Sequence, residues 1–171
     1  NVGGGYFTRL VRMAKSPREL RDLVSEYTRT FRGKPDWRFL AAAAHTAASN
    51  DVNDPVLASK LLRRILDRDL SRVHEGVFRS VLGKASHHQD RRSAQTAFDC
   101  LMPHVTPTDW ARLLHARAGD PDAHIALASM LDSTECTLNT DVRVVGVGLK
   151  CAAKSHASTL AHRLWAWAEP L

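Results

Sequence analysis

Pairs of small or apolar residues followed four positions later by a bulkier apolar residue recur along this chain at a regular distance. The five pairs are Leu20 with Val24, Ala58 with Leu62, Ala94 with Phe98, Ala123 with Leu127, and Ala161 with Trp165. Successive pairs lie 29 to 38 residues apart, with a mean of about 35. A period of this length is typical of helical hairpins that stack on one another, because no single hairpin can bury its apolar face alone.

Most of the pairs follow a helical stretch that ends in a short break of small and basic residues. These breaks are Ala14-Lys15-Ser16, Lys84-Ala85-Ser86-His87, Ala116-Arg117-Ala118-Gly119 and Ala153-Lys154-Ser155. Helix starts, each a capping residue followed by proline, are predicted at Ser16-Pro17, Asp54-Pro55, Thr106-Pro107 and Asp120-Pro121. The sequence therefore predicts an all-α fold, an α-solenoid of about 4 to 5 stacked hairpins. We expect one domain over residues 1–171, with repeats at roughly 2–36, 37–74, 75–104, 105–141 and 142–171.

Three segments carry a more specific pattern. They are Gly33-Lys34-Pro35-Asp36, residues 109–131 with their Ala-Arg-Ala-Gly-Asp break, and residues 78–98 with an aromatic residue at each end. They resemble the pentatricopeptide repeat family, a eukaryotic and chiefly organellar group of RNA-binding α-solenoids. Tetratricopeptide repeats share the period and usually bind proteins, but their Trp-Leu-Gly and Tyr pattern is not evident in this chain. The resemblance therefore favours the pentatricopeptide form.

The composition sets further bounds. The chain holds 24 Lys and Arg against 18 Asp and Glu, a net charge of +6, which favours a polyanionic partner such as RNA. The same charges would also suit the solvated faces of ordinary helices. Cys100, Cys136 and Cys151 form no CxxC pair, so we expect neither a zinc module nor a disulfide framework. No apolar run has the length of a membrane span, so we expect no membrane partner. Because the chain lacks an initiating Met, we interpret it as a processed or partial product, with room for further repeats after Leu171.

The family resemblance implies candidate RNA-binding positions. In the family, the first helix of each repeat lines the concave face, where one side chain near its start reads a base edge and a partner at the repeat end assists. Carried onto this chain, the base-reading positions are Ala41, Arg79, Asp109 and Gly146. The partners at the repeat ends are Asp36, His74, His104 and Asp141. Ala and Gly have no side-chain donor or acceptor, so we expect weak sequence selectivity.

Basic residues late in successive first helices form a second column, at a place where the family often keeps a cation facing the RNA backbone. The column consists of Lys15, His87, Arg117 and Lys154. Such a stripe can neutralise successive phosphates without reading sequence. These cations would also stabilise the C-terminal ends of their helices, and both roles remain open. Arg38, Arg112 and Arg143 lie in first helices too and would extend the basic surface.

Catalytic and metal-binding patterns are not evident. His87, His88, His115, His156 and His162 belong to no HExxH or HxH motif, and no convergent carboxylates accompany them. We therefore expect no enzyme activity, metal or cofactor. Trp165 and Trp167 point about 200° apart on a helix, so we expect one ring in the core and the other against a following repeat or a partner.

Together these features predict an RNA-binding pentatricopeptide-like protein of the mitochondrial matrix, or of another organelle. We expect it in a ribonucleoprotein, such as the mitochondrial ribosome or its assembly intermediates, in contact with single-stranded or ribosomal RNA and with other proteins. Two alternatives remain open: a free-standing factor that stabilises, processes or edits organellar transcripts, and a helical-repeat protein scaffold without RNA contact. A concave face rich in Lys, Arg and His would favour RNA, whereas an apolar and aromatic face would favour the scaffold.

Overall fold

The computed structural model describes residues 2–31, 36–67, 70–133 and 142–168. Within these ranges the chain forms ten α-helices, one short 3-10 helix and no strand, which confirms the predicted all-α fold. The first two repeats hold α1 (Val2–Met13), α2 (Pro17–Thr30), α3 (Trp37–Ala47), α4 (Pro55–Leu66) and the 3-10 helix η1 (Leu70–Arg72). Then follow α5 (Glu75–His87), α6 (Arg91–Asp99), α7 (Pro107–Arg117), α8 (Ala123–Asp132), α9 (Val142–Lys154) and α10 (Ser158–Ala168). None of these helices is long and apolar enough to cross a membrane.

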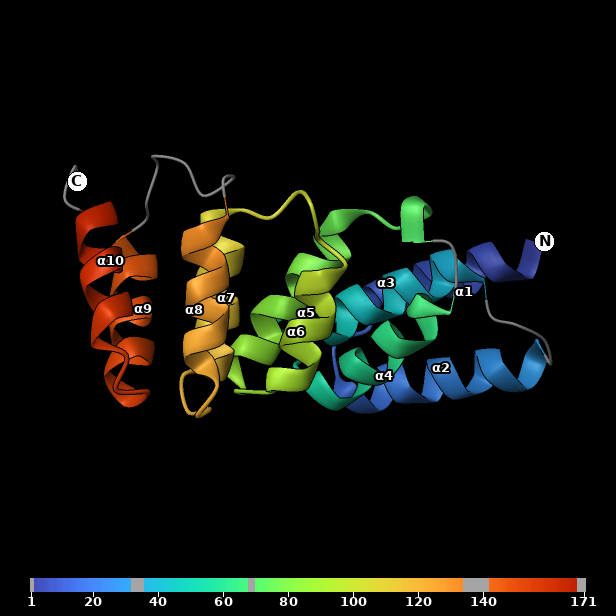
Figure 1. The fold of residues 1–171 in the computed structure, drawn as a ribbon. Coiled ribbons are helices and arrows are strands. Elements are labelled where there is room, and N and C mark those ends of the chain that lie inside the picture. The colour runs from blue at the N-terminus through green and yellow to red at the C-terminus, as the bar shows by residue number, and fades with distance from the viewer. Residues whose placement is uncertain (1, 32–35, 68–69, 134–141, 169–171) are drawn as a thin grey trace. The chain divides into compact units, whose positions relative to one another are not determined.

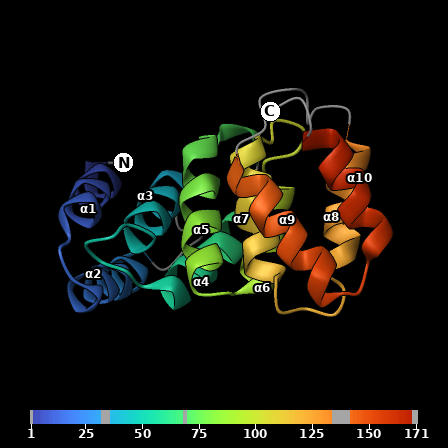
Figure 2. The ribbon, with the colours of Figure 1, turned by 90° about the vertical axis from the view of Figure 1, so that its left-hand side faces the viewer.

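Two compact units make up the chain, Asn1–Lys84 and Ala85–Leu171, and the boundary between them falls within α5. In unit 1, α3 packs against both α1 and α4, and Figure 1 shows α1 and α3 above α2 and α4. In unit 2, α9 packs against α7, α8 and α10, and α8 also contacts α10 (Figure 2). Each unit thus packs one first helix against the next, α1 on α3 and α7 on α9, as stacking of hairpins requires.

Local capping explains where most helices begin. Ser16, Asp54 and Thr106 each accept a hydrogen bond from a backbone N–H in the first turn, and each is followed by proline at the first helical position. The predicted start at Asp120-Pro121 is wrong, because α8 begins at Ala123. The Asp120 carboxylate is occupied by Arg91 at 3.0 Å and by Arg117 at 3.7 Å. It therefore ties α6 and α7 together instead of capping α8.

The recurring apolar pairs form the core. The first four pairs, from Leu20 through Leu127, are all less than a tenth exposed. The fifth pair departs from the pattern, because Trp165 is 63% exposed and Leu164, one residue earlier, is fully buried. Leu164 occupies the space that Gly148 of α9 leaves open, so the buried face of α10 is rotated by one residue relative to the prediction. Trp167 is half-buried, and neither tryptophan is a core residue.

Aromatic and small residues complete the packing of each unit. In unit 1, Tyr27 stacks on Phe39 with ring centroids 3.7 Å apart and an interplanar angle of 8°. The run from Ala41 to Ala44 on α3 is buried throughout, and small side chains there allow α1 and α4 to approach α3 closely. In unit 2, Phe98 of α6 packs on Trp110 of α7 with centroids 4.5 Å apart. Trp110 thereby joins the second helix of one hairpin to the first helix of the next.

Candidate nucleic-acid interface

A basic hollow lies on the first-helix side of unit 1. It has a volume of about 980 Å³, and its walls come from α1, α3, η1 and the first turn of α5. Among the described residues, its charged and titratable lining consists of four arginines, two histidines and one carboxylate: Arg9, Arg12, Arg38, Arg72, His45, His74 and Asp36. All seven side chains are exposed. A concave surface lined mostly by one sign of charge raises the local concentration of anions. We call this hollow the large hollow.

The start of α3 organises one side of the large hollow. Asp36 caps the helix by accepting from the Arg38 backbone N–H at 3.0 Å, and its own N–H donates to the Tyr27 hydroxyl at 3.2 Å. The Arg38 guanidinium lies 5.4 Å from the centre of the Trp37 ring, a cation–π contact that holds the charge at the edge of the hollow. The Asp36 carboxylate is thus engaged in capping. Arg9 and Arg12 of α1 and Arg72 of η1 line the hollow from other elements.

A smaller hollow occupies the corresponding side of unit 2. It has a volume of about 380 Å³ and lies between α7 and α9, beside Ser86 of α5. Its polar lining includes Arg112, His115 and Arg143 and, within the part of the chain that the structure describes, no Asp or Glu. The predicted residues Arg112 and Arg143, which lie 31 positions apart in the sequence, are brought together here. We call this site the small hollow.

The base-reading positions carried over from the family divide into two groups. Ala41 lines the large hollow and Gly146 the small one. Arg79 and Asp109 line neither hollow, and a strict 35-residue period from Ala41 leads instead to Gly76 and Ala111, which do. Arg79 forms an ion pair with Glu75 at 2.8 Å, one turn earlier on α5.

Asp109 has a structural role at the start of α7. It is fully buried, and its carboxylate accepts from both the backbone N–H and the hydroxyl of Thr106, completing a capping box. Arg112 lies 3.7 Å from the same carboxylate. Buried in this way, Asp109 cannot reach a base edge in this conformation.

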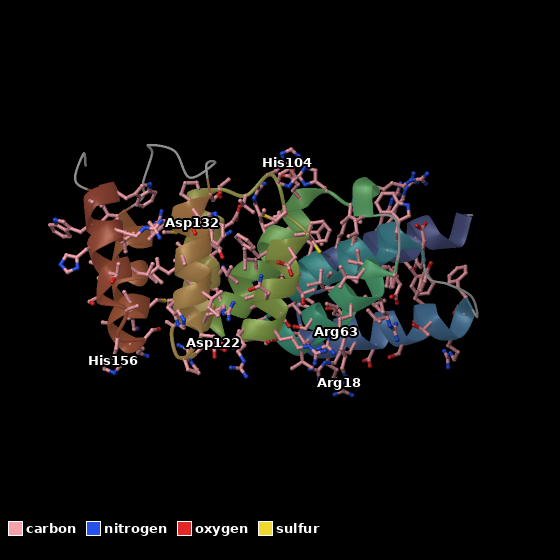
Figure 3. All side chains as sticks on the ribbon, in the orientation of Figure 1. Arg18, Arg63, His104, Asp122, Asp132 and His156 are labelled. Atoms are coloured by element: carbon pink, nitrogen blue, oxygen red, sulfur yellow. The ribbon has the colours of Figure 1, made fainter. Side chains whose placement is uncertain are left out.

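The repeat-end partners fall in three places. Asp36 and His74 line the large hollow, and His104 is an exposed residue after α6 (Figure 3). Asp141 lies outside the described residues, as do Gly33, Lys34 and Pro35 of the repeat-end pattern.

The column of basic residues at the helix breaks lies outside both hollows. Lys15, His87 and Lys154 are exposed at the ends of α1, α5 and α9, and the His87 ring packs edge-on against that of His88. Arg117 is only 20% exposed, with Asp120 at 3.7 Å and the Gln95 side chain at 3.2 Å. Its charge is therefore largely balanced within the protein.

Sequence reasoning missed several residues that line the hollows. Arg9 and Arg12 lie on the helical stretch that precedes the Ala14-Lys15-Ser16 break, and their spacing of three places them on one helix face. Arg72 belongs to η1. His45 and His115 lie 70 residues apart, twice the repeat period, so periodicity alone could have paired them.

The two cysteines among the described residues offer little reactivity, and Cys136 lies outside those residues. Burial, with a further contribution from the Asp99 charge, raises the pKa of the Cys100 thiol to about 11. Burial also raises the pKa of Cys151, although the charges of Lys150, Lys154 and Arg117 act in the opposite direction. Neither thiol provides a ready nucleophile near neutral pH. Among the described residues, no three His, Cys, Asp or Glu side chains are grouped so that they could hold a metal ion.

Comparison with protein-family models, with curated proteins and with solved structures found no match to this chain.

Proposed function

We propose that this protein binds single-stranded RNA along the first-helix faces of its two units and has no catalytic role. The large hollow carries the proposal, because four exposed arginines and two histidines face it against one capping carboxylate. Of the described residues that line it, Trp37 is the only aromatic one apart from the histidines. A surface of this kind favours RNA over the alternative of a protein scaffold, which would need an apolar concave face.

The chemistry of the lining suits the phosphodiester backbone. Guanidinium groups bind phosphate oxygens through paired N–H donors and stay charged at any physiological pH. The small hollow repeats the arrangement on a reduced scale, with Arg112 and Arg143 beside His115. A mitochondrial ribonucleoprotein, such as the mitochondrial ribosome, is the setting that we propose for this binding, on the strength of the pentatricopeptide resemblance.

The test compares two double variants that remove the same charge from different faces. Arg9→Gln with Arg12→Gln changes the large hollow, and Arg63→Gln with Arg64→Gln changes the exposed end of α4. Figure 3 shows Arg63 at the lower edge of the view together with Arg18 of α2, on the second-helix side of unit 1. Fluorescence anisotropy with a labelled single-stranded RNA gives the affinity at several salt concentrations.

We expect the large-hollow variant to weaken binding and to flatten the dependence of log K on log salt by about 0.7 per lost phosphate contact. The α4 variant should behave like the unmodified chain. Equal losses in the two variants would show that net charge, and not the hollow, drives the association. The absence of any salt-dependent RNA binding in the unmodified chain would refute the proposed function.

A further inference from the structure

Polar side chains recur on the first helices, each one helical turn after an Ala or Gly that has no polar side chain. His45, Ser80, His115 and Lys150 follow one another at intervals of 35 residues, on α3, α5, α7 and α9. Each stands four residues after a small residue that lines a hollow, namely Ala41, Gly76, Ala111 or Gly146. Residues four apart are neighbours on one helix face. The hydrogen-bonding groups that Ala and Gly cannot provide are therefore present one turn further along each helix.

Hydrogen bonding in unit 1 fixes the tautomer of His45. The Ser80 hydroxyl donates to the Gly76 carbonyl oxygen at 2.8 Å and lies 2.9 Å from His45 Nδ1. A hydroxyl has a single hydrogen and a carbonyl can only accept, so His45 Nδ1 must carry the hydrogen and donate it to Ser80 Oγ. In the neutral ring Nε2 is then a hydrogen-bond acceptor.

His115 of unit 2 has the same tautomer for a similar reason. Its Nδ1 lies 3.2 Å from the carbonyl oxygen of Ser86 and 3.4 Å from the hydroxyl of that residue. Because the carbonyl can only accept, Nδ1 is the donor and Nε2 is again left as the acceptor. A residue of α5 thus holds each ring by one nitrogen.

The other nitrogen of each ring is available for a ligand. Both rings line a hollow, and over the ranges that the structure describes neither Nε2 has a hydrogen bond. His74, also in the large hollow, has the opposite tautomer, because its Nδ1 accepts from the Gly76 N–H at 3.0 Å. The large hollow therefore presents an Nε2 acceptor from His45 and an Nε2–H donor from His74.

We infer that His45 and His115 read the bases of the bound RNA, each through Nε2 as an acceptor from an exocyclic amino group. The inference rests on the proposed function and assigns the specificity-determining residues of the same site. Adenine and cytosine carry such an amino group, whereas uracil presents a carbonyl oxygen at the equivalent place. The arginines position the strand by its phosphates, and the two histidines favour amino-bearing bases.

Homopolymer binding tests the assignment. Oligo(A), oligo(C) and oligo(U) of equal length are titrated at one mildly alkaline pH. The unmodified chain should favour oligo(A) and oligo(C) over oligo(U) about threefold to tenfold, as expected for one or two neutral hydrogen bonds. The variants are the pair His45→Asn with His115→Asn and the pair His45→Gln with His115→Gln.

The two amides separate the roles of the ring nitrogens. An Asn amide nitrogen can replace Nδ1 and keep the bond to α5, but it does not extend to Nε2, whereas Gln reaches the Nε2 position. The Asn pair should therefore bind all three homopolymers alike with an unchanged salt slope. The Gln pair should also lose the preference, because a Gln amide can turn either its oxygen or its NH2 group toward the base. His162→Asn is the matched control, because that ring also has Nδ1 against a carbonyl, Ser158 O at 2.8 Å, but belongs to a second helix outside both hollows.

The outcomes distinguish failure of the base-reading inference from failure of the proposed RNA binding. A preference for oligo(U) in the unmodified chain, no preference at all, or an amino-base preference that survives in a folded Asn pair would overturn the inference and leave the RNA-binding proposal intact. If the Asn pair loses its circular dichroism signal, the Gln pair decides, since an amino-base preference that survives there with RNA still bound contradicts the inference. Failure of the unmodified chain to bind any homopolymer would refute the proposed function and this inference together.

Discussion

Two glycines of α9, Gly146 and Gly148, stand in opposite surroundings, and replacing each with alanine tests how unit 2 is packed. A Cβ added at Gly146 meets no atom within 4 Å. A Cβ added at Gly148 would lie 2.6 Å from Leu164 Cδ2 and 3.2 Å from Leu127 Cδ1. Both leucines are fully buried, so neither can move aside without disturbing its neighbours.

The magnitudes follow from two opposing terms. Gly→Ala within a helix gains about 0.8–1 kcal/mol of intrinsic propensity at either position. At Gly148 the added methyl group also overpacks the contact between α8, α9 and α10, which typically costs about 1–3 kcal/mol. We expect Gly146→Ala to raise the free energy of unfolding by somewhat less than 1 kcal/mol. The propensity terms cancel between the two variants, so Gly148→Ala should be less stable than Gly146→Ala by about 1–3 kcal/mol.

Urea unfolding followed by far-ultraviolet circular dichroism measures both variants against the unmodified chain. The comparison uses midpoints at constant slope, since a changed slope would indicate a change in the unfolded or native ensemble. If the two variants differ by less than about 0.5 kcal/mol, the spread of ordinary surface substitutions, then α10 does not pack against Gly148 as described.

Two further predictions concern pH and reactivity. Burial would raise the pKa of Asp54, but hydrogen bonds from the Arg21 side chain and the Leu57 N–H, with the charges of Arg21 and Lys60, outweigh it and hold the pKa below its usual value. A lowered pKa stabilises the folded chain above the unfolded value near 4, so Asp54→Ala should lower the free energy of unfolding by about 1–2 kcal/mol at neutral pH. This deficit should shrink as the pH of the urea titrations falls below about 4, and a deficit independent of pH would contradict the Arg21–Asp54 pairing. With a pKa of about 11, Cys100 should react with iodoacetamide at pH 8 on the order of a hundredfold more slowly than an ordinary thiol. Mass spectrometry of a Cys136→Ser variant measures this, and a rate close to that of free cysteine would show that Cys100 is more exposed than the half-buried thiol of the structure.

The sequence predicted the hairpins because burial of a periodic apolar face dominates local structure. Leu20, Ala58, Ala94 and Ala123 all lie in the core, as the spacing indicates. The pattern failed at α10, where Leu164 and Trp165 are both apolar and periodicity cannot distinguish adjacent residues. Only the space above Gly148, a tertiary feature, selects Leu164 for the core.

The candidate site was harder to predict, because the sequence does not indicate which ion-pair partner a charged residue on a helix surface will contact. Asp120 resembles a capping residue, yet its carboxylate is occupied by Arg91, which is distant in sequence, and by Arg117, three residues earlier. Asp109 is different, since the Thr106-x-x-Asp109 spacing followed by an apolar run is itself a capping-box pattern. That local signal outweighs the family position and could have been recognised from the sequence.

The hollows owe their existence to small side chains, which bears on how recognition positions should be assigned. Ala41 and Gly76 in unit 1, and Ala111 and Gly146 in unit 2, leave space on the first-helix face because they project at most a methyl group. A position that makes room cannot also supply the hydrogen bond, so recognition must come from the polar side chains around it. His45 and His115 meet this requirement, because α5 holds each ring by Nδ1 and thereby fixes what Nε2 presents. If the protein binds RNA as proposed, the polar atoms held in place at the hollows should identify the recognition residues better than the repeat register does.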